Sequence, residues 1–240
     1  MRRDFEKNLE VNDFGEAIHS SCISHCLRYA FGDCDLPHPD TCTNCENFFS
    51  FFDKLREILP IECHQSLEIY QQKLLCFMAH HARKIYLNQQ LKANLRELDH
   101  NGALIIVDYK MRVNPQSARE TKADFYGKRG FTLHSVLVYT KSENDGNLNI
   151  SVFDHWSNDT KQDAWFTASS LHAVIDTLDN KPQWVTIVSD NGPHYHNTEL
   201  MIILAHWKEW YDISVNKWMF LEAGEAKTMI DSHHAQVSII

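Results

Sequence analysis

The 240-residue sequence has little glycine and proline, 8 and 6 residues respectively, and no long apolar run. The low glycine and proline content excludes a collagen-like or linker-dominated chain. The longest aliphatic runs, 103–107 and 201–205, are far shorter than the roughly 20 residues that a membrane-spanning helix needs. The N-terminus carries two arginines with no apolar stretch behind them, so it lacks the pattern of a secretory signal. We therefore expect an intracellular chain without a membrane partner.

The sequence does contain enough apolar residues for a core, since 43% of its residues are apolar and 23% are charged. This composition is typical of a globular chain with one large domain or two small ones. Its seven cysteines are an odd number, and two of them form a Cys-x-x-Cys pair at Cys42 and Cys45. In an intracellular chain this pattern favours metal-binding or structural thiols over disulfides.

A net positive charge is also missing, because 23 basic and 32 acidic residues give a net charge of −9. This total argues against a nucleic-acid partner, but the charge is unevenly distributed. Residues 110–131 contain six basic and two acidic residues, whereas the sequence after Phe131 contains six basic and fourteen acidic ones. The basic segment is either a docking site for nucleic-acid phosphates or a solvated loop without a partner. Its basic residues are Lys110, Arg112, Arg119, Lys122, Lys128 and Arg129.

The residue pattern changes near Asn101, which predicts two regions. Residues 1–100 are expected to form a helical, cysteine- and histidine-rich zinc-binding region. Residues 101–240 are expected to form a second domain, whose last helix the end of the sequence would truncate. Apolar spacing predicts a helix over 46–59, and a longer helical pattern runs over 63–98 without glycine or proline. The longer helix is either a dimerisation arm or a helix packed across its own domain.

Strand patterns follow Asn101. Three strands come first, the last two joined as a hairpin, and then helix, strand, helix, strand and a final helix. The expected strands are 103–110, 131–141, 148–155, 183–189 and 214–221. This order is that of the ribonuclease-H-like α/β fold, a mixed sheet flanked by helices. In that topology the first and fourth strands are neighbours, which would bring Asp108 and Asp190 together at one edge of the sheet.

Asp108 and Asp190 are therefore the first candidates for chemistry. Asp108 interrupts an apolar strand, where an unpaired carboxylate is costly, and Asp190 ends another strand within Ser-Asp-Asn-Gly-Pro-His. Two carboxylates that meet repel each other unless a divalent cation such as Mg²⁺ or Mn²⁺ lies between them. The alternative for each residue is a salt-bridged or turn-capping aspartate, because Asp-Asn-Gly is also a favourable turn sequence.

A third metal-binding acid is expected near the start of the last helix. Glu225 is preferred, because a helix N-terminus stabilises an anion. Asp231 comes second, because His234 shares its helix face. The adjacent His233 and His234 provide a phosphate contact or a general acid near the metals, or are ordinary surface or core histidines. The remaining candidates for the third acid are Glu222 and Asp154.

Four residues with zinc-ligand side chains follow one another closely at Cys34, His38, Cys42 and Cys45. Zinc takes four thiolate or imidazole ligands in a tetrahedron, and a Cys-x-x-Cys turn supplies two of them. The spacing predicts one structural zinc site, with free buried thiols as the alternative. Three nearby residues are candidates for a missing ligand or for a second site: Cys22, His25 and Cys26.

Several segments of the sequence resemble the catalytic core of DDE-type transposases of eukaryotic cut-and-paste elements. These segments are VDYK at 107–110, GKRGFTLH at 127–134, FDHWSNDTKQDAW at 153–165, SDNGPHYHN at 189–197 and FLEAGEAKTMIDSHHA at 220–235. The resemblance extends from about residue 22 to residue 240 and is strongest from residue 103 onward. It implies that Asp108 and Asp190 are the first two catalytic carboxylates, with Glu225 or Asp231 as the third. The sequence departs from the family pattern at Ala226, where relatives have glycine.

The resemblance implies a nuclear enzyme of transposition, a form of DNA recombination. Such an enzyme cuts DNA at an element's ends and joins the freed 3′-hydroxyl to target DNA by two-metal catalysis. The basic segment and the zinc region would hold the DNA, and further copies of the chain are a second kind of partner. Two alternatives stay open: a decayed or domesticated module that binds DNA or protein, and a general nuclease. Intact Asp108 and Asp190 favour the enzyme, whereas the net charge of −9 favours the binding module.

Overall fold

The computed structural model describes residues 9, 11–12, 16–114, 118–143, 146–222 and 229–237. The chain divides into two compact units, Met1–Leu91 and Lys92–Ile240, and each unit has an apolar core of its own. Helix α4 begins in the first unit and ends in the second.

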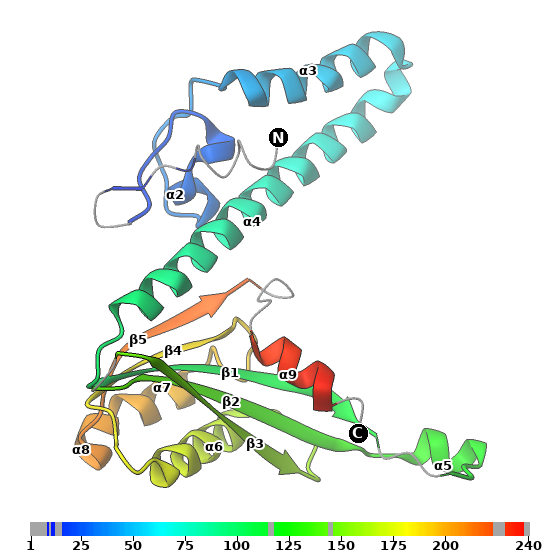
Figure 1. Ribbon diagram of the computed structural model, residues 1–240. Helices are drawn as coiled ribbons and strands as arrows, with labels where there is room; N and C mark the ends of the chain where they lie inside the picture. The colour runs from blue at the N-terminus through cyan, green and yellow to red at the C-terminus, as the bar shows by residue number, and fades with distance from the viewer. Residues whose placement is uncertain are drawn as a thin grey trace. The chain divides into compact units, whose positions relative to one another are not determined.

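The first unit contains short helical turns followed by longer helices (Figure 1). The helical patterns predicted over 46–59 and 63–98 are both confirmed. Pro60 follows the end of α3, whereas the absence of glycine and proline lets α4 continue for 34 residues. Among the described residues, no helix combines the length and the apolar character that crossing a membrane requires. The elements are η1 (Ile23–His25), α2 (Leu27–Ala30), α3 (Thr43–Ile58), η2 (Ile61–Cys63) and α4 (His64–Glu97).

The second unit is built on a five-stranded sheet with the order β3-β2-β1-β4-β5. The pairs β1–β2 and β2–β3 are antiparallel, whereas β1–β4 and β4–β5 are parallel. This arrangement is the mixed sheet of the ribonuclease-H-like fold, so the predicted α/β fold class is confirmed. The strands are β1 (Gly102–Val113), β2 (Phe131–Lys141), β3 (Leu148–Ser157), β4 (Trp184–Asp190) and β5 (Ser214–Leu221).

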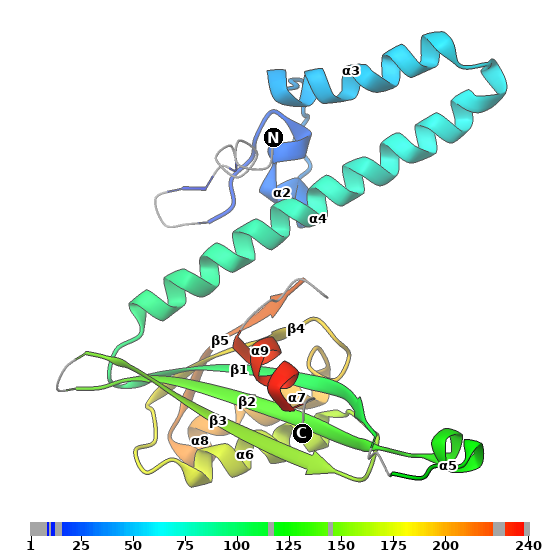
Figure 2. The same cartoon turned by 45° about the vertical axis from the view of Figure 1, so that its right-hand side comes forward.

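Helices cover both faces of this sheet. Figures 1 and 2 show α6, α7 and α8 on one face and α9 on the other, while α5 lies in the segment between β1 and β2. Local capping sets where two of them begin: Asp163 accepts a hydrogen bond at the start of α6, and Asn197 does so at the start of α7. The helices are α5 (Lys122–Gly127), α6 (Ala164–Thr177), α7 (Thr198–Ala205), α8 (Trp207–Tyr211) and α9 (Met229–Val237).

Alternation along the central strand β1 decides which side chains face each helical layer. Ile105, Val107 and Tyr109 belong to the apolar core that contains residues of α6 and α7. Because successive side chains point to opposite faces of a strand, Asp108 lies on the face covered by α9. The apolar residues of β1 before Asp108 are at most 4% exposed, so this carboxylate follows a fully buried run.

Candidate active site and metal centres

A row of polar side chains crosses three strands on the α9 face of the sheet. Asp108 on β1 lies directly opposite Ser135 on β2, and Ser135 lies directly opposite Asp154 on β3. Ser135 Oγ donates a hydrogen bond of 2.6 Å to Asp154 Oδ1. Opposite residues in antiparallel strands point to the same face, so these three side chains form a continuous polar row from the central strand to the edge strand.

The structure brings Asp108 and Asp190 together, in agreement with the strand order. β1 and β4 run parallel, their pairing ends with Ile106 beside Val188, and Asp108 and Asp190 each follow this last pair by two residues. Burial, followed by the negative charges of Asp190 and Asp231, raises the pKa of Asp108 to about 7. The carboxylates therefore repel one another, and a bound cation would relieve that repulsion.

Asp190 ends β4 in a tight turn that keeps its carboxylate ionised. Its Oδ1 accepts a hydrogen bond of 2.9 Å from the Gly192 backbone and lies 3.5 Å from His194 Nε2. The interaction with His194 lowers the pKa of Asp190. A Cβ atom at position 192 would lie 2.5 Å from His194 Cε1 and 2.9 Å from Asp190 Oδ1, which explains why this turn contains glycine.

Two histidines attach α9 to the polar row. His233 Nε2 lies 2.9 Å from both carboxylate oxygens of Asp154. His234 Nε2 lies 2.9 Å from Ser135 Oγ, and its Nδ1 lies 3.5 Å from Asp108 Oδ2. Consecutive histidines thus contact both ends of the row, and α9 is held against all three strands.

The protonation of His234 follows from its partners. Ser135 donates its hydroxyl proton to Asp154, so the serine oxygen accepts a hydrogen bond from His234 Nε2. Burial lowers the pKa of His234 to about 4, which leaves a neutral imidazole with a lone pair on Nδ1. Two acceptors, His234 Nδ1 and Asp108 Oδ2, then face each other at 3.5 Å.

Asp231 is the third carboxylate near Asp108. It is exposed, lies in the first turn of α9, and its charge contributes to the raised pKa of Asp108. The preferred sequence candidate, Glu225, lies outside the described residues. Glu222 follows directly after β5 and is half-buried, and Asp154 is engaged by the polar row and α9.

Sequence analysis did not single out Ser135 or His194 as site residues. Ser135 is fully buried within an otherwise mostly apolar strand. The signal available for Ser135 was a polar residue within a mostly apolar strand, because a buried polar side chain needs a hydrogen-bond partner. The signal for His194 was its place four residues after Asp190, within the same short motif.

The basic segment presents its six basic residues in different ways. Lys128 pairs with Glu120, and both side chains are largely buried, at 16% and 15% exposed. Lys110 Nζ donates to the backbone carbonyl of His234, so it joins β1 to α9 and is not directed at the loop. The Arg112 side chain lies outside the described residues. The three basic residues exposed in the loop are Arg119, Lys122 and Arg129.

The structure does not bring the four predicted zinc ligands together as one set. Cys34 and His38 belong to a first tetrad, and Cys42 and Cys45 belong to a second. The path of the backbone accounts for this: a parallel bridge joins Cys22 to Asp40, which brings Cys42 and Cys45 at the start of α3 close to Cys22. Residues that are neighbours in sequence therefore enter different groups. The first tetrad is His19, Cys26, Cys34 and His38, and the second tetrad is Cys22, His25, Cys42 and Cys45.

Each tetrad can hold a metal such as zinc. In both groups the four ligand atoms lie within 4.8 Å of one another. Each combines thiols with imidazole nitrogens, the donor types that zinc prefers. The cysteines proposed from the sequence as alternates, Cys22 and Cys26, are thus members of the two groups, together with His25. Cys63 and Cys76 are exposed and belong to neither.

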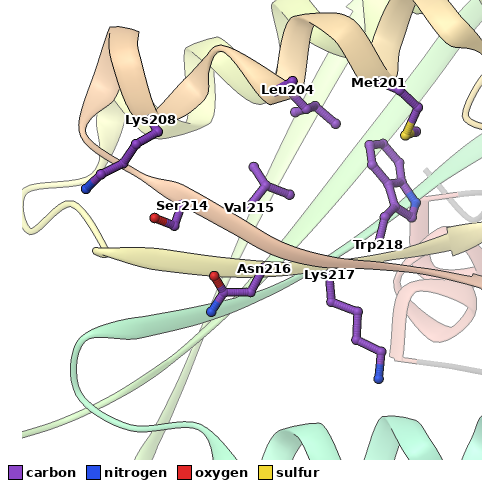
Figure 3. Close-up of a pocket in the computed structure, with 9 residues that line it drawn as sticks. Met201, Leu204, Lys208, Ser214, Val215, Asn216, Lys217 and Trp218 are labelled. Atoms are coloured by element: carbon purple, nitrogen blue, oxygen red, sulfur yellow. The ribbon is translucent and has the colours of Figure 1, made fainter.

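A separate pocket lies between α7 and the edge strand β5 (Figure 3). Its described lining combines apolar side chains with Lys208 and Lys217, and it contains no carboxylate, histidine or cysteine. Lys208 contacts the carboxylate of Asp212 at 2.5 Å. We therefore assign the pocket no catalytic role.

The fold and the site define a ribonuclease-H-like α/β domain with a cluster of carboxylates at one edge of its sheet. A family model described as "Domain of unknown function (DUF8701)" matches residues 86–238, and the chain belongs to this family. No curated protein matches the sequence. A crystal structure of the Mos1 strand transfer complex is similar over 98% of this chain and 78% of that chain, with 14% identity and a TM-score of 0.33. This similarity is too low to assign a function.

Proposed function

We propose that this chain is a transposase-like polynucleotidyl transferase that cuts and joins DNA with two divalent metal ions. The observation that carries the proposal is the convergence of Asp108, Asp190 and Asp231 at one edge of a ribonuclease-H-like sheet. The resemblance of the sequence to DDE-type transposases supports the same function.

Asp108 and Asp190 would hold Mg²⁺ or Mn²⁺, because hard cations prefer carboxylate oxygens. When bound, such ions activate a water or 3′-hydroxyl for attack and stabilise the leaving oxygen of a phosphodiester. The chain itself keeps Asp190 ionised through Gly192 and His194. It also holds Asp108 opposite a second acceptor, the Nδ1 atom of His234. Both arrangements favour a cation at this edge of the sheet.

Asp231 is our candidate for the third metal ligand. A ligand requires a fixed position, and the helix that carries Asp231 is attached to the sheet through His233 and His234. Because these two imidazoles are engaged with Asp154 and Ser135, we assign them positioning roles and not the general-acid role, which was one of the alternatives that the sequence left open.

DNA would bind through the exposed cations Arg119, Lys122 and Arg129, since phosphate contacts dominate the affinity of proteins for DNA. In this proposal residues 1–100 form a zinc-stabilised region and residues 101–240 form the catalytic domain. The enzyme would act on nuclear DNA, and joining two element ends would require an assembly of several copies.

A catalytically inactive module that binds DNA or protein is the second candidate function. The net charge of −9 favours the protein-binding form of this module, because an excess of negative charge opposes extended contact with DNA. The two functions differ in what they require of Asp108: an enzyme needs its carboxylate for metal binding, whereas a binding module does not.

The deciding experiment incubates the full chain with a supercoiled plasmid and a labelled oligonucleotide bearing a free 3′-hydroxyl, with Mg²⁺ or Mn²⁺. A polynucleotidyl transferase should nick the plasmid and attach the label to it, whereas a general nuclease should only nick it. Asp108→Asn should abolish both products, and the matched control Asp159→Asn, at an exposed position, should not. DNA binding without any metal-dependent product would overturn the enzymatic proposal in favour of the binding module.

A further inference from the structure

Eight zinc-ligand side chains lie between His19 and Cys45 and divide into the first and second tetrads defined above. We infer that this segment binds two zinc ions, one in each tetrad, and that occupation of each site supports the other. This inference concerns the first unit alone and does not depend on the proposed catalytic function.

The distances in the first tetrad match a tetrahedral zinc site. Tetrahedral zinc with bonds of about 2.3 Å to sulfur and about 2.0 Å to nitrogen separates its ligand atoms by roughly 3.5–3.8 Å. His19 Nδ1 lies 3.3 Å from Cys34 Sγ and 3.8 Å from Cys26 Sγ. The two sulfur atoms are 3.8 Å apart, and His38 Nε2 lies 3.9 Å from Cys34 Sγ. The set has two thiols and two imidazoles.

The second tetrad shows the same match with three thiols and one imidazole. His25 Nδ1 lies 3.4 Å from Cys22 Sγ, 3.6 Å from Cys42 Sγ and 3.8 Å from Cys45 Sγ. One imidazole nitrogen thus faces three sulfur atoms, an arrangement that a metal ion at the centre explains directly. Cys22, His25 and Cys45 are buried, so the site is closed, as structural zinc sites are.

Disulfide formation does not account for these groups. All seven cysteines are free. The sulfur atoms of Cys26 and Cys34 are 3.8 Å apart, whereas a disulfide bond measures about 2.05 Å. Histidine nitrogens also lie at ligand distance from the thiols in both tetrads, and disulfide formation would not explain their presence.

The backbone links the two sites. His25 and Cys26 are adjacent residues that belong to different tetrads. Cys34 and His38 of the first tetrad lie in the loop between His25 and Cys42, which both belong to the second tetrad. A metal ion in the second tetrad would therefore close the loop that contains these two ligands of the first. The bridge between Cys22 and Asp40 holds the base of this loop. Loss of one ion would therefore loosen ligands of the other.

The described apolar cluster around α2 is small, so metal ions at the two tetrads would contribute to the stability of this segment. Among the described residues, the apolar cluster that contains α2 consists of Leu27, Ala30 and Ala82 together with a few partly buried neighbours. A cluster of this size contributes little to folding by itself, and small regions are commonly stabilised by metal ions. Cys26 also caps α2, because its sulfur accepts the backbone N–H of Tyr29 at 3.4 Å.

The test is the zinc content of the purified full-length chain, measured by elemental analysis and by native mass spectrometry. Two zinc ions per chain are expected. Cys34→Ser should remove the ion of the first tetrad, and Cys42→Ser that of the second. Each variant should also weaken binding of the remaining ion by roughly tenfold or more. The matched controls Cys63→Ser and Cys76→Ser, at exposed cysteines outside both tetrads, should retain two ions.

Two further variants separate this assignment from a single site made of Cys34, His38, Cys42 and Cys45. His19→Ala and Cys22→Ser should each lower the zinc content, whereas the single-site arrangement predicts no effect of either. If a variant fails to fold, His38→Cys, which keeps a ligand in place, should retain two ions and a folded chain. One zinc ion or none in the wild-type chain, or unchanged zinc content in His19→Ala, would overturn the inference. None of these results bears on DNA cleavage, so the two proposals fail independently.

Discussion

His233 Nε2 contacts both carboxylate oxygens of Asp154 at 2.9 Å and so joins α9 to the edge strand β3. Asp154 also accepts the hydroxyl proton of Ser135, which in turn contacts His234. One carboxylate therefore holds two consecutive histidines of the same helix, one directly and one through a serine. Because Asp231 lies on that helix, its position relative to the central strands depends on Asp154.

Replacing Asp154 by alanine should reduce metal-dependent cleavage by roughly 10- to 100-fold, because α9 loses its attachment to β3. The measurement is the cleavage rate as a function of Mg²⁺ concentration, and the variant should require more Mg²⁺ for half-maximal rate. DNA affinity should be unchanged. Asp154→Glu should recover part of the activity, and Asp159→Ala serves as a control. An unchanged Mg²⁺ requirement in Asp154→Ala would contradict a positioning role.

Asp108→Asn should stabilise the metal-free protein at alkaline pH. The folded-state pKa of Asp108 is raised from 3.8 to about 7, so the folded state binds this proton more tightly than the unfolded state does. The wild-type chain therefore loses stability as the pH rises from about 4 through about 7. The asparagine variant lacks this loss. Urea denaturation should show a gain of about 4 kcal/mol or less at pH 8 and little difference at pH 4.

Asp190→Asn provides the opposing control for this measurement. Its folded-state pKa is lowered, so its charge stabilises the fold at neutral pH and the contribution is lost as the pH falls. The variant should therefore be less stable than wild type at pH 8, by about 1 kcal/mol. Added Mg²⁺ should raise the melting temperature of the wild-type chain and of neither variant. A stabilisation of the same sign in both variants would contradict the different environments of these carboxylates.

Two single variants distinguish the candidates for the third acid. Asp231→Asn should lower the cleavage rate by roughly 100-fold or more, a loss comparable to removing other preorganised charged groups from active sites. Glu225→Gln should cost little. Both are measured in the plasmid assay at saturating Mg²⁺, with DNA binding as the control. The reverse pattern would return the role to Glu225, and activity in both variants would direct attention to Glu222.

The exposed part of the basic segment should determine the salt dependence of DNA binding. Replacing Arg119, Lys122 and Arg129 together by alanine should weaken binding equally for all sequences. The slope of log K against log salt should decrease by roughly one unit for each DNA phosphate that the variant no longer neutralises. Lys128→Ala should change the slope less and lower the stability instead, because Lys128 pairs with Glu120 in a largely buried site. An unchanged slope in the triple variant would identify the loop as a solvated one.

The sequence by itself was sufficient to predict the mixed sheet and to single out Asp108 and Asp190 as candidates. Alternation within a strand is a local property, and the order of strands and helices in this fold decides which strands become neighbours. Asp108 was therefore recognisable as a carboxylate within a buried apolar strand, and Asp190 as a carboxylate that ends a second strand. The parallel pairing of β1 with β4, expected from the strand order, is observed up to Ile106 and Val188, two residues before Asp108 and Asp190.

Only the tertiary structure decided which side chains share a site. The zinc-ligand spacing predicted one set, yet the Cys22–Asp40 bridge sends neighbouring ligands into two tetrads, because loop path and not sequence separation sets the distance between them. The polar row depends in the same way on strand register, which placed Ser135 between Asp108 and Asp154. Neither strand register nor loop path can be predicted from local residue patterns, because both follow from packing between segments that are distant in the chain.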